Sequence, residues 1–328
     1  MGKDKTGDNQ RWVNFYLSNP MRPGESVVSW CNRVWSLSGL AGPLSLRNKY
    51  RRNIKDNLPV RISVDEARSC RVLLLDIETA PLLSYVWGRW KQDINDVQVI
   101  NDWYMITWAG KWLFEDGVMS ERLTSSEAKR QDDRRISKIL WEKINEADVV
   151  IAHNAKGFDI KRVNTRFVVH GFPPPMPYKV IDTLLHSRSQ FAFSSNSLDS
   201  LNRSLDLRRK RDHEGFEMWS KCYGGDVDSL RKMEEYNIHD IYALEDFYLR
   251  IRPWIQPHPN IALHIMDDVQ RCPSCASSDI TWGGEYHTSV NVYAAFRCNG
   301  CGSIGRSRVT SVPAKKRKYI NASIGKNT

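Results

Sequence analysis

The sequence predicts an α/β domain in the middle of the chain, and three stretches carry this prediction. The aliphatic run at 72–75 is typical of a strand buried on both faces. Apolar residues at helical spacing across 134–146 predict an amphipathic helix. The sequence DVVIAH at 148–153 predicts a second buried strand. Strand, helix and strand in succession are typical of an α/β fold.

The other elements of this domain, for which we expect the bounds 67–255, follow from the same periodicities. They are strands at 103–114 and 180–185, and helices that end at Gly171, at 197–207 and at 227–252, where Pro253 stops the last one. Five tryptophans lie between Trp87 and Trp112, and we expect them to pack in the core, although they could also stack on bases.

Composition is that of an ordinary globular protein, with 328 residues, 41% hydrophobic and 26% charged. We find no apolar run of membrane-spanning length and no signal-peptide core in the first ten residues. The seven cysteines include two tight pairs, which is a metal pattern and not a disulfide framework. We therefore expect an intracellular, cytoplasmic protein without membrane contact.

The net charge of +10 lies at the two ends of the chain. Residues 1–66 carry 11 Lys and Arg against 6 Asp and Glu, and residues 256–328 carry 9 against 4. The middle of the chain is neutral. This distribution predicts a neutral body held to a polyanion, with nucleic acid as the first candidate. The alternative is a basic tail that only aids solubility.

The N-terminal region, 1–66, shows a helical pattern at 25–37, a turn rich in Gly and Pro at 38–43, and a basic helical pattern at 44–54. Helix, short turn and basic helix resemble a helix-turn-helix unit. The alternative is a two-helix appendage with a solvated basic side.

Two carboxylates end the first strand. Asp76 and Glu78 are separated by one residue, so in an extended strand both project to the same side. Buried acids are unfavourable without compensation, and a divalent cation is a suitable partner. Alone, the pair is more often a hydrated strand end than a metal site.

Two later stretches hold further candidates. Asp159 lies in the first turn of the helix that ends at Gly171. An acidic residue at such a position often does no more than stabilise the helix by its interaction with the helix dipole. Tyr236 and Asp240 lie four residues apart on the last helix, so they project from one face. Each of these stretches is a weak indication of a site when taken alone. Tyr236 and Asp240 could simply lie on the exposed surface of a helix.

Taken together, the motifs D-I-E at 76–78, N-A-K-G-F-D at 154–159 and Y-N-I-H-D at 236–240 resemble the DEDD exonucleases of the ribonuclease H-like superfamily. The resemblance is to the subgroup with tyrosine in the third motif (DEDDy), which includes polymerase proofreading domains and stand-alone phage and bacterial relatives. It covers residues 70–252 and implies a mixed sheet flanked by helices. Asp182 also resembles a frequent acidic position of this family.

The resemblance implies two-metal phosphodiester hydrolysis with Mg²⁺ or Mn²⁺. Asp76, Glu78 and Asp240 would hold one ion, and Asp159 would support a second. Tyr236 would orient the attacking water. The remaining motif residues, Asn154 and Phe158, would help to hold the terminal nucleotide.

The C-terminal region, 256–310, contains C-P-S-C and C-N-G-C motifs that predict a closed structural Zn²⁺ site and a zinc ribbon. The four predicted ligands are Cys272, Cys275, Cys298 and Cys301. A redox dithiol pair is the alternative. Strands are expected around a turn at Gly283–Gly284, and the tail at 311–328, with KKRK at 315–318, is expected to be disordered.

The function expected from the sequence is a metal-dependent 3′→5′ exonuclease that acts on nucleic acid, with DNA favoured over RNA. Replication or recombination proteins are expected partners. One alternative is a ribonuclease or structure-specific DNA nuclease of the same fold. Another alternative is a non-catalytic nucleic-acid-binding protein. The presence of all four motif acids argues against it.

Overall fold

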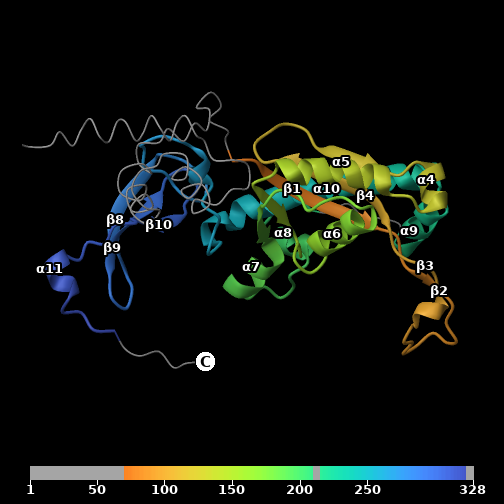
Figure 1. The fold of residues 1–328 in the computed structure, drawn as a ribbon, viewed down its shortest axis with the longest axis horizontal. Coiled ribbons are helices and arrows are strands. Elements are labelled where there is room, and N and C mark those ends of the chain that lie inside the picture. The colour runs from red at the N-terminus through yellow and green to blue at the C-terminus, as the bar shows by residue number, and fades with distance from the viewer. Residues whose placement is uncertain (1–69, 210–214, 323–328) are drawn as a thin grey trace, which may run out of the picture. The chain divides into compact units, whose positions relative to one another are not determined.

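The structure, a computed structural model, describes residues 70–209 and 215–322 (Figure 1). The chain divides after Glu66 into two units, and all described residues belong to the second unit, Ala67–Thr328. The predicted helix-turn-helix at 1–66 and the last six residues of the tail therefore lie outside the described residues. None of the described helices is long and apolar enough to cross a membrane.

A mixed five-stranded sheet forms the centre of the domain, in the order β5-β4-β1-β6-β7. Strand β1 is antiparallel to β4 on one side and parallel to β6 on the other. The bounds are β1 Val72–Thr79, β4 Met105–Trp112, β5 Met119–Arg122, β6 Val149–Ala152 and β7 Lys179–Asp182. Helices flank this sheet, which confirms the predicted ribonuclease H-like fold class.

Alternate residues of β1 enter two separate apolar clusters, as strand geometry requires. Leu73, Leu75 and Ile77 pack with residues of helices α5 and α6. Val72 and Leu74 pack with residues of α8 and the second half of α10. The flanking helices are α4 Ser125–Arg130, α5 Arg134–Glu146, α6 Asp159–Val169, α7 Thr183–Gln190, α8 Leu198–Ser204, α9 Phe216–Tyr223 and α10 Val227–Ile251. The predicted burial of the first strand on both faces is confirmed.

Polar contacts set the position of α10 on the sheet. Lys111 on β4 donates to Glu245 over 2.7 Å, and both side chains are largely buried. Arg122 on β5 donates to Glu234 over 2.8 Å. Because the two acids lie about three turns apart on α10, the contacts resist both sliding and rotation of the helix.

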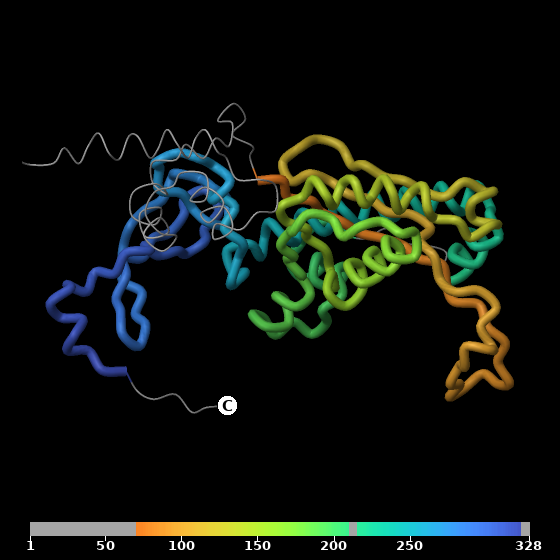
Figure 2. Tube along the Cα trace, viewed as in Figure 1, coloured from red at the N-terminus to blue at the C-terminus, as the bar shows by residue number. Residues whose placement is uncertain are grey.

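The prediction of core packing is wrong for two tryptophans. Trp108 and Trp112 are buried on β4, whereas Trp87 and Trp90 are 98% and 84% exposed. These two lie on an arm between β2, Leu83–Ser84, and β3, Val99–Asn101, which pair with each other and not with the central sheet (Figure 2). A two-stranded ribbon lacks the second layer that burial needs.

The C-terminal region forms a second, three-stranded antiparallel sheet of β8 Ile280–His287, β9 Val292–Cys298 and β10 Ile304–Arg306. The first cysteine motif precedes β8, and the second connects β9 to β10. The predicted turn at Gly283–Gly284 is wrong. Strand β8 continues through the glycines with an irregular register, and the chain reverses at 288–291, where Thr288 donates to the Asn291 carbonyl. Gly284 has a φ of +82°, which a bulge accommodates as readily as a turn.

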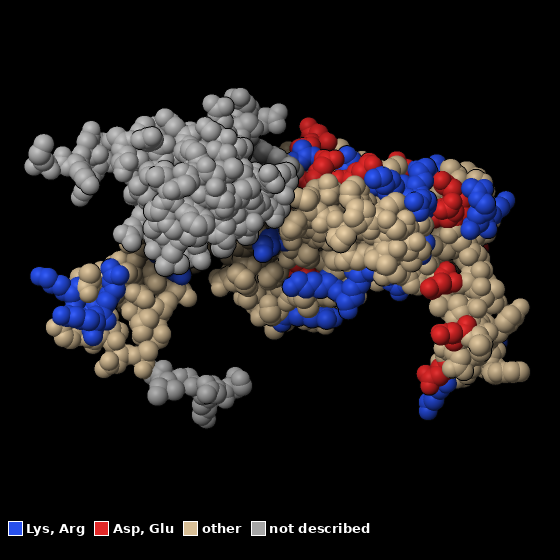
Figure 3. Space-filling model, viewed as in Figure 1, with Lys and Arg blue, Asp and Glu red and all other residues tan. Residues whose placement is uncertain are grey.

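Part of the basic tail is helical. Helix α11 spans Ala314–Arg317, and the Arg317 guanidinium donates to the Val312 carbonyl, so the prediction of disorder is wrong for this segment. Figure 3 shows Lys and Arg side chains gathered over α11. The short 3₁₀ helices are η2 Asp96–Gln98, η3 Arg252–Trp254 and η4 Ile261–His264.

A buried carboxylate joins α6 to the sheet, and its replacement tests this joint. Asp133 is fully buried and accepts from the Met105 N–H over 2.8 Å and from Arg166 over two contacts of 2.6 Å. We expect Asp133→Asn to lower the free energy of unfolding by about 3–5 kcal/mol, because it leaves the Arg166 charge poorly compensated. Urea denaturation measures this. The adjacent, exposed Asp132→Asn is the control, and equal stability of the two variants would contradict the assignment.

Candidate active site

Strand β1 presents Asp76 and Glu78 on the face that α10 covers. Side chains two residues apart on a strand project to the same face. Asp76 and Glu78 therefore lie on the face of Val72 and Leu74, whose side chains pack against α10 residues. On β4, Asp76 lies opposite Ala109 and Glu78 opposite Thr107. Both acids are half-buried at the end of the strand. The predicted common side of the two carboxylates agrees with this arrangement.

Helix α10 brings the third acid to this strand end. Asp240 is 1% exposed, and one carboxylate oxygen each of Asp76, Glu78 and Asp240 lies within 4.8 Å of the others. Tyr236 lies one turn earlier on the same helix, and its ring packs edge-on against Trp219 at 6.4 Å between centroids. Residues that are far apart in the sequence therefore meet in one cluster.

The fourth acid, Asp159, faces the same cluster from the first turn of α6. Its side chain is 2% exposed, and among the described residues its Oδ1 has no hydrogen-bond partner. Burial, followed by the negative charges of Asp76 and Glu78, raises the pKa of Asp159 well above its ordinary value. A carboxylate in this position is stabilised by a nearby cation.

Asp182 organises the loop that leads to Asp159. Its carboxylate accepts from the backbone N–H groups of Asn154 and Lys156 over 3.2 and 2.9 Å, and it also caps α7. For this reason the predicted strand at 180–185 ends at Asp182. Asn154 has a φ of +75°, and a Cβ at Gly157 would lie 2.3 Å from the Asn154 Oδ1, so a larger residue at position 157 would displace the Asn154 side chain. Asp182 thus holds the backbone of the second motif.

Asn237 belongs to the site but was not predicted from the sequence. It is fully buried, and its Nδ2 donates to the Asp76 Oδ2 over 2.5 Å. The signal was present, because Asn237 is a polar residue within the buried stripe formed by Leu230, Met233 and Ile241. His239, by contrast, donates from Nε2 to the Arg209 carbonyl over 2.7 Å.

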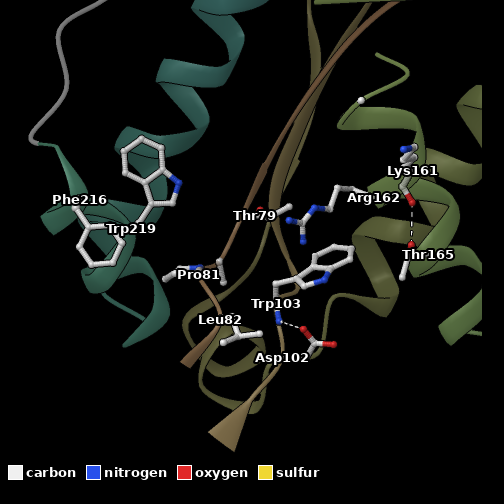
Figure 4. A pocket seen from close by; sticks show the side chains of 12 residues that line it. Thr79, Pro81, Leu82, Asp102, Trp103, Lys161, Arg162, Thr165, Phe216 and Trp219 are labelled. Carbon is white, nitrogen blue, oxygen red and sulfur yellow. Dashed lines mark hydrogen bonds between the residues drawn. The ribbon is translucent and has the colours of Figure 1, made fainter. Parts of the chain in front are cut away.

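A cleft of about 840 Å³ is lined by residues of the β1 end, α6 and α9 (Figure 4). Its lining includes Thr79, which directly follows Glu78, and Gly157 of the second motif. The Arg162 guanidinium stacks over the Trp103 ring at 4.1 Å and lies 5.3 Å from the Phe158 ring. The lining also includes Asp102, Lys161, Phe216 and Trp219, which the sequence did not single out.

The four predicted zinc ligands converge in the C-terminal sheet. The Sγ atoms of Cys272 and Cys301 are 3.7 Å apart, and those of Cys275 and Cys298 are 3.5 Å apart. Tetrahedral zinc thiolates with bonds of about 2.3 Å place neighbouring sulfurs about 3.8 Å apart. The four cysteines therefore fit a structural metal ion, as the predicted zinc ribbon requires.

The acidic cluster also fits cations. Hard divalent ions prefer carboxylate oxygens, and the buried Asp159 Oδ1 offers a further donor beside the three converging acids. Among the described residues, these acids therefore offer oxygen ligands to a metal ion, and the four cysteines offer sulfur ligands.

A comparison with models of protein families agrees with the fold. Residues 101–251 match the model of the RNase_H superfamily. No curated protein matches the sequence. Among solved structures, the family B DNA polymerase from the hyperthermophilic archaeon Pyrobaculum calidifontis matches with a TM-score of 0.43 and 16% sequence identity, and the match covers 60% of this chain. It spans 26% of the polymerase chain.

Metal binding to the acids predicts a stabilisation that depends on Asp240. Because a ligand that binds only the native state stabilises it, we expect saturating Mg²⁺ to add about 2.7 kcal/mol at 100 times its Kd. Asp240→Asn should lose most of this increment. The measurement is thermal unfolding with and without Mg²⁺. Asp246→Asn on the same helix is the control, and an undiminished Mg²⁺ effect in Asp240→Asn would contradict the assignment.

Proposed function

We propose that this protein is a metal-dependent 3′→5′ exonuclease, with DNA as the favoured substrate. The observation that carries the proposal is the convergence of Asp76, Glu78 and Asp240, with Asp159 facing them, on a ribonuclease H-like fold. Nuclease chemistry on this fold depends on such a cluster of carboxylates. The order of the three sequence motifs supports the 3′→5′ polarity and the tyrosine subgroup.

Mg²⁺ or Mn²⁺ fits the oxygen donors. Two such ions, when bound, lower the pKa of an attacking water and neutralise charge on the leaving oxygen. Asp76, Glu78 and Asp240 would hold one ion, and Asp159 would support the other. Asn237 fixes the orientation of the Asp76 carboxylate through its hydrogen bond.

Tyr236 is the residue that orients the attacking water. It lies one turn from Asp240, and the packing of its ring against Trp219 holds the phenol in place. A phenol is a poor base at neutral pH, so its role is to direct the water and not to take its proton.

The cleft fits an unpaired nucleic-acid end. Aromatic rings stack on bases, and Lys and Arg meet phosphates, which is the usual combination for single strands. Trp103, Phe216 and Trp219 supply the rings, and Lys161 and Arg162 supply the charge. Asn154 and Phe158, next to the cleft, would hold the terminal nucleotide. These last two assignments rest on the motif resemblance.

The C-terminal region would provide a further binding surface for the nucleic acid, outside the acidic cluster. Cys272, Cys275, Cys298 and Cys301 would bind a structural Zn²⁺. In the neighbouring strands, Arg306 stacks over Tyr293 at 4.1 Å, which leaves a flat cationic face. We further propose a cytoplasmic enzyme that works with replication or recombination proteins.

The proposed activity predicts release of mononucleotides from 3′ ends. We expect a 5′-labelled single-stranded DNA to shorten stepwise in Mg²⁺ or Mn²⁺ and to remain intact in EDTA. Matched RNA and duplex substrates separate the ribonuclease and structure-specific alternatives. Binding without any turnover in either ion would favour the non-catalytic alternative.

Loss of a central carboxylate should separate binding from hydrolysis. We expect Asp76→Asn to slow hydrolysis at least about 1000-fold, because several kcal/mol of transition-state stabilisation are lost. DNA affinity should change little. Single-turnover kinetics and fluorescence anisotropy measure the two effects, with Asp199→Asn on α8 as the control. Hydrolysis at the wild-type rate would refute the site.

Tyr236→Phe tests the orienting role alone. The ring and its packing on Trp219 remain, so stability should hold, while hydrolysis should slow about 100-fold through misplacement of the water. Single-turnover rates at saturating Mg²⁺ measure this. A rate equal to that of the wild type would remove Tyr236 from the mechanism.

A further inference from the structure

Three side chains that can bind a metal ion form a group that contains none of the motif acids and none of the four zinc-motif cysteines. Cys70 precedes β1, Asp148 precedes β6, and His264 ends the 3₁₀ helix η4. One ligand atom from each lies within 4.8 Å of the others. No sequence motif marks this group, because its members come from three distant segments.

The imidazole and the carboxylate are spaced for a shared ion. The His264 Nδ1 and the Asp148 Oδ2 are 3.6 Å apart, which is too long for a hydrogen bond. Two ligands on tetrahedral zinc, with bonds of about 2.0–2.1 Å, stand about 3.3 Å apart. A small side-chain movement therefore brings both within reach of one ion, and the Cys70 thiol, within 4.8 Å of the other two ligand atoms, needs a shift of at most about 1.3 Å.

The backbone around the group is well anchored. The Asp148 Oδ2 accepts the Arg71 N–H over 2.8 Å, and the Asp148 carbonyl accepts from Lys179 over 2.8 Å. On the opposite side, Ile261 begins η4, is buried in the core, and donates its N–H to the Pro273 carbonyl. Such outer contacts orient metal ligands in protein sites.

We propose that Cys70, Asp148 and His264 form a second zinc site, separate from the four cysteines. A thiolate with an imidazole favours zinc over Mg²⁺, and three protein ligands leave a fourth position for water. The side chains of Asp148 and His264 are 24% and 36% exposed, so an ion can enter from solvent. The bound ion would tie η4, which follows α10, to the starts of two central strands.

The same three side chains have an alternative interpretation that involves no metal ion. Asp148 and His264 could form a surface ion pair, which contributes little to stability, with Cys70 beside it by chance. The two interpretations differ in the role of the thiol, because only the metal site needs it.

Zinc content distinguishes the two. The full-length protein is loaded with zinc under reducing conditions, passed into buffer with excess Mg²⁺, and its zinc is measured by mass spectrometry. We expect Cys70→Ser and His264→Gln each to hold about one zinc ion fewer per chain than the wild type. His287→Gln, an exposed histidine on β8, is the matched control and should lose none. Asp76→Asn should also lose none, which separates this site from the acidic cluster.

Cobalt provides an independent measurement. Added to zinc-free protein, Co²⁺ bound at this site should give a thiolate charge-transfer band whose amplitude falls in Cys70→Ser and is unchanged in His287→Gln. Circular dichroism confirms folding, and if Cys70→Ser does not fold, His264→Gln carries the test because its side chain is partly exposed. A folded variant with wild-type zinc content and an unchanged cobalt spectrum would overturn the proposal.

Discussion

Mutual repulsion among buried carboxylates is the constraint on which this structure depends. Asp159 and Asp240 are almost completely buried, and Asp76 and Glu78 stand close to them. Like charges at such distances cannot all remain ionised without a cation. Burial, and after it the negative charges of Asp76 and Glu78, raises the pKa of Asp159. The scaffold must therefore hold the acids together against a force that pushes them apart.

Rigid elements supply that resistance. The start of β1 pairs with both β4 and β6, its end at Asp76 and Glu78 pairs with β4, and apolar clusters pack on both faces of the strand. Helix α10 is held by the Lys111–Glu245 and Arg122–Glu234 pairs. The second motif begins in a loop and not in a helix or strand. The Asp182 carboxylate holds the backbone of this loop by accepting hydrogen bonds from two of its N–H groups. Asp133 holds the far side of α6 in the same way.

The local sequence signals succeeded where one face of an element is buried by its neighbours. Apolar periodicity identified β1, α5, α6 and α10, and the two-residue spacing of Asp76 and Glu78 placed both on one side. The same signals failed where burial depends on what lies opposite. Trp87 and Trp90 are large aromatic residues of the kind that usually packs in a core, but no second layer of the described residues covers them. Gly283–Gly284 has the composition of a turn but sits within a strand.

By itself, the sequence determined the acids of the motifs, the tyrosine, the four cysteines and the order of the principal strands and helices. These follow from spacing along the chain, because strand and helix periods are local properties. Only the tertiary structure decided that Asn237 bonds Asp76, that Trp103, Arg162 and Trp219 share one cleft, and that Cys70 meets His264. Each of these joins segments far apart in the chain, and no local period records such a meeting. The half-buried carboxylates at the end of β1 belong to both groups: the spacing identified them, and the fold brought Asp240 to them.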